Sequence, residues 1–68
     1  MKQIKDVAWE IMTKDSVHHI IVDYKGITLM IGTPKEIFLV AYPSLVVKDI
    51  DRRFVDQNII TLDVEIVE

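Results

Sequence analysis

Apolar residues recur with a helical period at the start of the chain. The positions i, i+3, i+4, i+7 and i+8 share one stripe of a helix, and here they hold Ile4, Val7, Ala8, Ile11 and Met12. Neither Gly nor Pro interrupts the segment. The spacing predicts an amphipathic helix over residues 2–14, with Trp9 outside the stripe, on the flank of the buried face.

Residues 17–31 are rich in β-branched side chains and carry one interruption, the sequence Asp-Tyr-Lys-Gly at residues 23–26. This interruption is typical of a type I turn with Gly26 in the left-handed conformation. It predicts a β-hairpin in which Asp23 pairs with Ile27. In that register both faces of the hairpin are apolar.

The next segment reads as a turn and a buried strand. Residues 32–35, with the sequence Gly-Thr-Pro-Lys, predict a second turn in which Pro34 supplies a fixed φ. Residues 36–42 are almost continuously apolar. This run predicts a third strand that is covered on both faces, at the centre of the sheet.

Two interpretations fit the stretch after Pro43. As a helix capped by Ser44, it gathers its apolar residues within about 100° of one another, namely Val46, Val47, Ile50 and Phe54. As a strand it alternates poorly, but Asn58 could then turn the chain into the next strand. We favour the helix for residues 44–58.

The final segment alternates regularly between apolar and polar residues. Its apolar positions are Ile60, Leu62, Val64 and Ile66, and the polar positions between them predict a strand with one solvated face. The whole pattern predicts a single α+β domain over residues 1–68. We expect an N-terminal amphipathic helix packed on an antiparallel sheet of four or five strands, with a second short helix before the last strand.

Length and composition narrow the classes of protein. A chain of 68 residues has room for one core, and 50% hydrophobic against 28% charged residues is a globular balance. The chain has no cysteine, which excludes disulfides and thiolate zinc sites. Its longest apolar run, residues 37–42, is far below the roughly 20 residues of a membrane span. No signal-peptide pattern follows Met1, so we expect a cytoplasmic location.

The sequence offers weak candidates for metal binding and catalysis. His18 and His19 are adjacent, and adjacent residues on a strand point to opposite faces, so the two rings cannot easily share one ion. Ser16 shares a strand face with His18 but has no acid to orient the pair. We therefore predict no metal site, no cofactor and no catalytic residue.

Two pairs of carboxylates have the i, i+2 spacing that places them on one face of a strand: Asp49 with Asp51, and Asp63 with Glu65. General acid and base catalysis also needs a pocket that excludes water and separates the two pKa values. A solvated strand face supplies neither condition. We interpret these pairs as a solubilising face, and expect a protein that is not an enzyme.

One short basic segment is a candidate for nucleic-acid contact. Lys48, Arg52 and Arg53 precede Phe54, which combines cations for phosphates with an aromatic ring for bases. The aspartates interspersed among them neutralise this charge. Nucleic acid is therefore an unfavoured partner, because the net charge is −3 and the sequence pI is near 5.2.

A short N-terminal helix followed by a hairpin with the sequence Lys-Gly-Ile-Thr-Leu at residues 25–29 resembles the opening of Sm-like RNA-binding ring proteins. The resemblance covers residues 2–31. It implies a helix followed by a five-stranded barrel if residues 44–58 are strand, with RNA as the partner. The RNA-contacting motif of that family has no counterpart in the second half of this sequence.

The apolar hairpin faces suggest what the protein binds. One or two short helices cover one face of a sheet, so apolar surface is left for another chain. We expect a non-enzymatic regulatory or accessory protein that binds protein and acts as a homo-oligomer, most simply a homodimer. The candidate contact residues are Trp9, Tyr24 and Met30. The alternative is a nucleic-acid-binding module that uses Lys48, Arg52 and Arg53.

Overall fold

The computed structural model describes residues 2–14, 16–40 and 42–67. Its elements are β1 (Lys2–Gln3), α1 (Ile4–Lys14), β2 (His19–Tyr24), β3 (Ile27–Gly32), α2 (Pro34–Val40), β4 (Leu45–Asp51), the 3-10 turn η1 (Val55–Gln57) and β5 (Ile59–Ile66). Ala41, which is part of the predicted third strand, lies outside the described residues.

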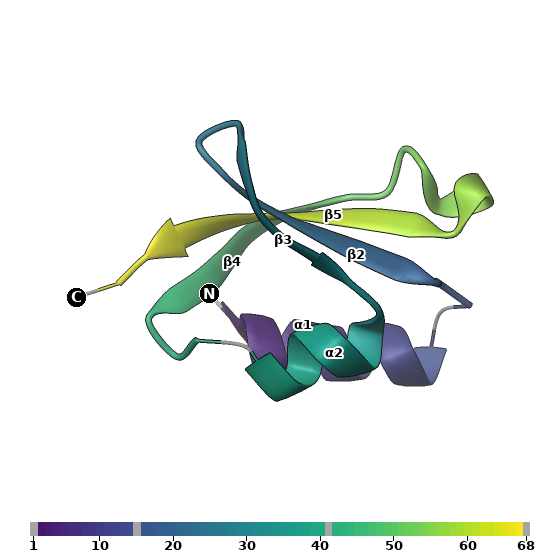
Figure 1. Ribbon diagram of the computed structural model, residues 1–68, viewed down its shortest axis with the longest axis horizontal. Helices are drawn as coiled ribbons and strands as arrows, with labels where there is room; N and C mark the ends of the chain where they lie inside the picture. Colours follow the sequence, from purple (N-terminus) through teal and green to yellow (C-terminus); the bar gives the residue numbers. More distant parts are fainter. Residues whose placement is uncertain (1, 15, 41, 68) are drawn as a thin grey trace.

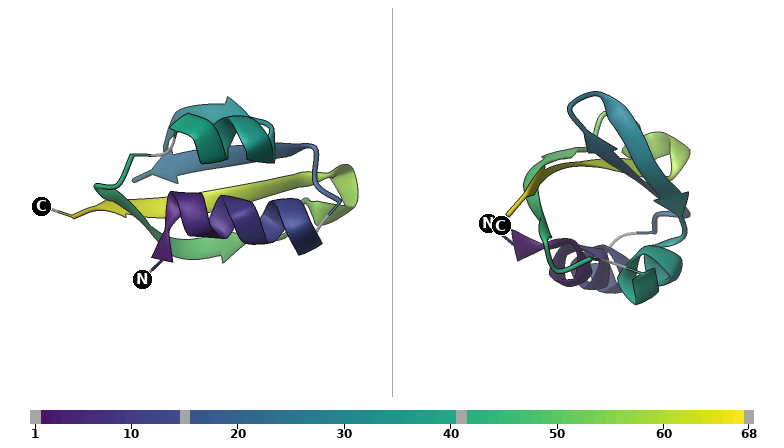
Figure 2. Two further views of the ribbon diagram at one scale, coloured as in Figure 1. Left: turned by 90° about the horizontal axis from the view of Figure 1, so that it is seen from below. Right: turned by 60° about the vertical axis from the view of Figure 1, so that its left-hand side comes forward.

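The fold has two layers, a five-stranded sheet and a pair of helices (Figure 1). The strand order is β1-β4-β5-β2-β3, and α1 and α2 lie side by side on one face, under the twisted sheet (Figure 2). The predicted α+β class is confirmed, with its N-terminal helix and a second helix before the last strands. The sheet is mixed and not purely antiparallel, because β2 runs parallel to β5.

The hydrophobic core fills the space between the helices and the sheet. Its fully buried large side chains are Ile4 and Ile11 of α1, Ile20 and Val22 of β2, Ile37 of α2, and Ile60 and Leu62 of β5. Burying such aliphatic side chains is the main favourable term in folding, at about 1.5–3 kcal/mol each. Neither α1 nor α2 lies over the opposite face of the sheet, and we call it the open face (Figure 1).

The N-terminal helix is confirmed at Ile4–Lys14. The stripe residues Ile4, Val7, Ala8 and Ile11 are buried, as the spacing predicts, and the fifth stripe residue, Met12, is half-buried. The two residues before the helix form β1, in which Gln3 pairs with Val46 of β4. The predicted start at residue 2 is therefore two residues early.

The hairpin is confirmed, but its turn and register are different from the prediction. The loop has two residues, Lys25 at φ 50° and Gly26 at φ 80°, and Tyr24 pairs with Ile27. Positive φ at both loop residues is the signature of a type I′ turn, whose twist matches that of the flanking strands. The predicted pairing of Asp23 with Ile27 is wrong. Asp23 pairs with Thr28.

The predicted third strand over residues 36–42 is wrong, because residues 36–40 belong to helix α2 and Tyr42 lies in the loop before β4. Thr33 caps the helix: its hydroxyl accepts a hydrogen bond from the Glu36 amide at 3.2 Å, and Glu36 accepts one from the Thr33 amide at 3.3 Å. These reciprocal bonds form a capping box, with Pro34 at the first helical position. The chain therefore has the predicted second short helix, but at Pro34–Val40.

The favoured helix over residues 44–58 is also wrong, and the strand interpretation is correct. Residues 45–51 form β4, which pairs with β5 along its length and with β1 at Val46 and Val47. Asn58 turns the chain into β5 in the left-handed conformation, at φ 64°. Tertiary pairing overrides the helical spacing of the apolar residues.

The final strand is confirmed at Ile59–Ile66. Ile60, Leu62 and Val64 are buried, and the residues between them are half-buried on the open face. Asp63 and Glu65, two of the residues that make the end of the sequence acidic, lie on that open face. None of the described helices is long and apolar enough to cross a membrane.

Candidate functional site

Strand β3 forms one edge of the sheet, with β2 as its only strand neighbour in the described structure. Its six residues include no charged side chain and no proline. Ile27 and Ile31 are each 64% exposed, and Leu29 is 44% exposed. Leu29 is also the extra residue of a β-bulge, since the register passes from Thr28 to Met30. The edge is therefore open and apolar.

A groove of about 310 Å³ lies between β3 and α2. Its lining residues are Met30, Ile31, Gly32, Glu36, Ile37, Leu39 and Val40. Leu39 is 68% exposed, and the adjacent Val40 is more than half exposed. Glu36 is the only charged residue in the described lining. We call β3 and this groove together the β3 edge surface.

The opposite edge of the sheet is built differently. There β1 has only two residues, one of them Lys2. Beyond β1, the edge belongs to β4, which has an irregularity between Val47 and Asp49 and carries Lys48, Asp49 and Asp51. Charges, irregularities and short edge strands are the usual protection of a sheet against further pairing. The β3 edge shares one of these features, its bulge at Leu29, but it is six residues long and carries no charge. It is therefore less protected than the β4 edge.

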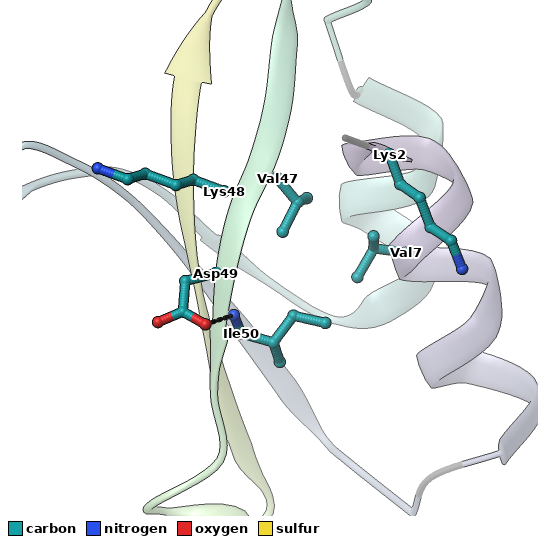
Figure 3. Close-up of a pocket in the computed structure, with 6 residues that line it drawn as sticks. All are labelled: Lys2, Val7, Val47, Lys48, Asp49 and Ile50. Atoms are coloured by element: carbon teal, nitrogen blue, oxygen red, sulfur yellow. Dashed lines mark hydrogen bonds between the residues drawn. The ribbon is translucent and has the colours of Figure 1, made fainter.

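A second cleft, also of about 310 Å³, separates α1 from β4 (Figure 3). Val7, Val47 and Ile50 lie between the helix and the strand, whereas Lys48 and Asp49 extend to the other side of β4 (Figure 3). The Asp49 carboxylate accepts a hydrogen bond of 2.9 Å from the Ile50 amide. The lining also includes Lys2, Lys48 and Asp49, but the side chains that lie between α1 and β4 are apolar.

Trp9 lies on the helix layer and is 53% exposed, so its predicted position outside the buried stripe is confirmed. Its ring centroid is 5.8 Å from that of Phe38 on α2, and the Lys5 ammonium lies 5.3 Å from the Phe38 centroid. Glu10, which like Trp9 lies on α1, accepts a hydrogen bond from Lys2 that lowers the pKa of the Glu10 carboxyl group. The role of Trp9 as a partner contact stays a prediction.

Tyr24 and Met30, the other two predicted partner contacts, lie on the hairpin. Both side chains are half-buried and pack against the core. Met30 also lines the groove of the β3 edge surface. The Lys25 ammonium lies 5.3 Å from the centroid of the Tyr24 ring. The three predicted residues therefore occupy two places, with Trp9 on the helix layer and Tyr24 and Met30 at the hairpin.

The basic candidates lie at the end of β4 and in the loop that follows. Lys48 approaches Glu65 at 3.6 Å, and Arg53 donates to both carboxylate oxygens of Asp51, with a shortest distance of 2.6 Å. Arg52 is exposed. Hydrogen bonds from the Arg53 side chain and backbone lower the pKa of Asp51, and the same contact raises that of Arg53. Lys48 and Arg53 thus have carboxylate partners.

The open face carries a row of aspartates. Asp23 on β2 pairs with Asp63 on β5, which in turn pairs with Asp49 on β4. Thr28 donates a hydrogen bond of 2.9 Å to Asp23. Within residues 2–14, 16–40 and 42–67, no group of three His, Asp or Glu side chains is placed to hold a metal ion. The row makes the centre of the open face negative.

Both histidines are exposed at the start of β2. The amides of His18 and His19 donate to the Asn58 carbonyl, at 3.0 and 3.2 Å. This contact joins β2 to the turn before β5. Ser16 is also exposed, on the loop that precedes the strand. The backbone of this region therefore has a structural role in starting the parallel β2–β5 pair.

The exposure of Leu39 and Val40 is missed by the sequence argument, which places them in a strand at the sheet centre. The signal that reveals them is the sequence Thr-Pro-Lys-Glu at residues 33–36, a capping box with proline at the first helical position. A seven-residue helix on one face of a sheet buries only part of its circumference. The rest of the apolar run must then be exposed.

Comparison with known proteins gave no match to this chain among protein-family models, curated proteins or solved structures. The resemblance to Sm-like proteins implies one helix followed by five strands. The structure instead has α2 between β3 and β4, and β1 before α1. The geometry of the chain itself therefore carries the functional argument.

Proposed function

We propose that this protein is a small non-enzymatic regulatory or accessory protein that works by binding protein, including further copies of itself. The observation that carries this proposal is the β3 edge surface, where an uncharged open strand adjoins an apolar groove. Contiguous exposed apolar surface typically marks an interaction site. A cytoplasmic location stays an expectation from the sequence.

Five large apolar side chains are exposed at the β3 edge surface. Ile27, Leu29 and Ile31 lie along β3, and all three are exposed by more than two fifths. Ile31 lines the groove together with Leu39 and Val40 of α2, which are more than half exposed. Isolated exposed apolar residues are common and need no explanation. Here they adjoin one strand edge and one groove, which supports a docking site rather than scattered exposure.

Nucleic-acid binding remains the alternative, and the contacts described above argue against it. Lys48 and Arg53 are paired with Glu65 and Asp51 in the described structure. The aspartate row on the open face of the sheet repels phosphate. Neither observation favours a phosphate-binding surface, so we keep protein binding as the proposed function.

The oligomeric mass in solution tests the proposal. Light scattering coupled to size-exclusion chromatography should give a mass above the 7.9 kDa of one chain at micromolar to near-millimolar concentrations. Leu39→Lys places a charge in the groove and should shift the mass toward that of a single chain. Burial of an unpaired ammonium in an apolar contact is strongly unfavourable.

Val67→Lys is the matched control, because Val67 is an exposed apolar residue that follows β5, away from the groove. It adds the same charge and should leave the oligomeric mass unchanged. A wild-type mass of one chain at all these concentrations, without binding of a hydrophobic dye, would contradict the proposed function.

A further inference from the structure

We propose that two copies of this chain pair through β3, side by side and antiparallel, to form one continuous sheet across a two-fold axis. This inference rests on the proposed function and specifies its geometry. Sheet extension of this kind gains affinity from main-chain hydrogen bonds and specificity from the side chains beside the strand. The occupant of the β3 edge is therefore the β3 edge of a second copy.

The two edges of the sheet decide which strand can serve as the partner. A contact between β3 of one copy and the opposite edge of another would meet β1, which has two residues, or the charged part of β4. Such a head-to-tail contact would also leave free edges and continue into a filament. Pairing β3 with β3 uses the longer uncharged edge twice and closes the assembly.

Backbone geometry supplies the groups that such a partner needs. Tyr24 and Ile27 close the two-residue loop, and the pair next to it is Asp23 with Thr28. Antiparallel pairs alternate between hydrogen-bonded and non-hydrogen-bonded, and the pair that closes a two-residue loop is of the first kind. The amide and carbonyl of Thr28 therefore point away from β2, toward the open edge.

Charge complementarity also favours a second copy. In an antiparallel pair, the hairpin tip of one copy lies near the end of β3 at which the α2 of the other copy begins. The tip carries Lys25, and the groove at that end carries Glu36 as its one charged residue in the described lining. The two-fold axis brings this pair of opposite charges together twice.

The open face gives the reason for pairing at the edge and not face to face. Two copies stacked on their open faces would bring together two aspartate rows, each formed by Asp23, Asp63 and Asp49. Like charges in contact disfavour an interface strongly. Extension at β3 leaves both rows in water. The middle residue of each row lies on β5, two strands away from the β3 edge.

Amide hydrogen exchange of the wild-type protein tests the pairing directly. On going from a monomeric dilution to a concentration that saturates self-association, exchange of the Thr28 amide should slow by about tenfold or more. The Lys5 amide, in the first turn of α1, is the internal control and should not slow. First-turn amides lack an intrahelical acceptor, and α1 lies away from β3.

A pair of variants tests the same contact by affinity. Ile31→Lys places a charge on the open edge at a position that is exposed in the single chain, and should weaken self-association by about 30-fold or more. The matched control is Ile66→Lys, at an exposed isoleucine at the end of β5. It should change the dissociation constant by less than about twofold.

The outcomes separate this inference from the proposed function. Self-association with an unchanged rate of Thr28 exchange would overturn strand pairing and leave protein binding standing. A chain that is monomeric at every concentration would overturn both. If Ile31→Lys lost its folded circular dichroism spectrum, the exchange measurement on the wild-type protein would decide the question alone.

Discussion

Arg53 and Asp51 show how two residues shape the exit from a strand. The Arg53 side chain donates through Nε and Nη2 to the Asp51 carboxylate, and its backbone amide donates to the same group at 2.9 Å. Charge-assisted, bidentate bonds of this kind are the strong ones among side-chain contacts. They fix the direction of the chain as it leaves β4.

The titration of Asp51 should report this contact. Its folded-state pKa is lowered, first by the Arg53 side chain, so its contribution to stability is present above the unfolded pKa and is lost as pH falls through the folded pKa. Arg53→Gln should move the Asp51 pKa upward, toward its ordinary value, in a carboxyl-carbon NMR titration. The contribution is small, because Arg53 is exposed.

Lys35→Gln removes an equal charge from an exposed position on α2 and serves as the control. It should leave the Asp51 titration in place. An Asp51 pKa that did not rise in the Arg53 variant would show that the contact is absent in solution.

At the scale of elements, helix α2 is the part of the fold where local signals outweigh the apolar pattern. Its apolar residues include Ile37, Leu39 and Val40, a composition that also suits a strand. The capping box formed by Thr33 and Glu36 satisfies amides at the start of the helix, and Pro34 is preorganised for the first turn. These start signals select the helix.

Removing the cap should therefore destabilise the protein. Thr33→Ala takes away the hydroxyl that accepts from the Glu36 amide and should lower the free energy of unfolding by about 1 kcal/mol. Urea unfolding followed by circular dichroism measures the loss. The effect acts on the whole transition, because Ile37 of the same helix is part of the core.

Thr13→Ala is the matched control in helix α1. The Thr13 hydroxyl donates back to the carbonyls of Trp9 and Glu10 in the last turn of α1, an interaction that does not cap the start of the helix. Alanine has the higher helix propensity, so this variant should keep or slightly raise the stability. Equal losses in both variants would contradict the capping role of Thr33.

On the scale of the whole molecule, β5 joins all parts of the structure. It pairs in parallel with β2 and antiparallel with β4, and it supplies Ile60, Leu62 and Val64 to the core. The helices cover only one face of this sheet. One hydrophobic core, between the helices and the sheet, therefore holds the two layers together. We expect the chain to unfold as one unit.

Leu62→Ala tests whether the chain unfolds as one cooperative unit. Leu62 is fully buried at the centre of β5, and its truncation should cost about 2–5 kcal/mol of unfolding free energy. Helix and tryptophan signals should shift together to the same lower urea midpoint. Ile66→Ala truncates an exposed residue of the same strand and should cost much less. Separate transitions for the two signals would disprove cooperative unfolding.

The sequence by itself determined the elements whose periodicity is unambiguous. The stripe of α1 and the alternation of β5 each repeat over several residues, and both were predicted to within two residues. The hairpin was also predictable, because Gly26 accepts positive φ without strain. Its register was not, because a two-residue loop and a bulge at Leu29 shift the pairing without changing the apolar pattern.

The site was only partly predictable for the same reason. The sequence predicts Met30 as a contact residue, and Met30 does line the groove, but the same pattern places Leu39 and Val40 in a buried strand. For α2, the capping box is present in the sequence, but the strand prediction rests on the apolar run alone.

Tertiary structure alone decided the rest. Residues 45–51 have helical spacing, yet pairing with β5 on one side and β1 on the other makes them a strand. The parallel β2–β5 pair then leaves β3 at the edge. Whether an apolar strand is central or open depends on which strands flank it, and neighbours distant in sequence leave no mark on local periodicity. The exposed β3 edge surface is thus a property of the topology.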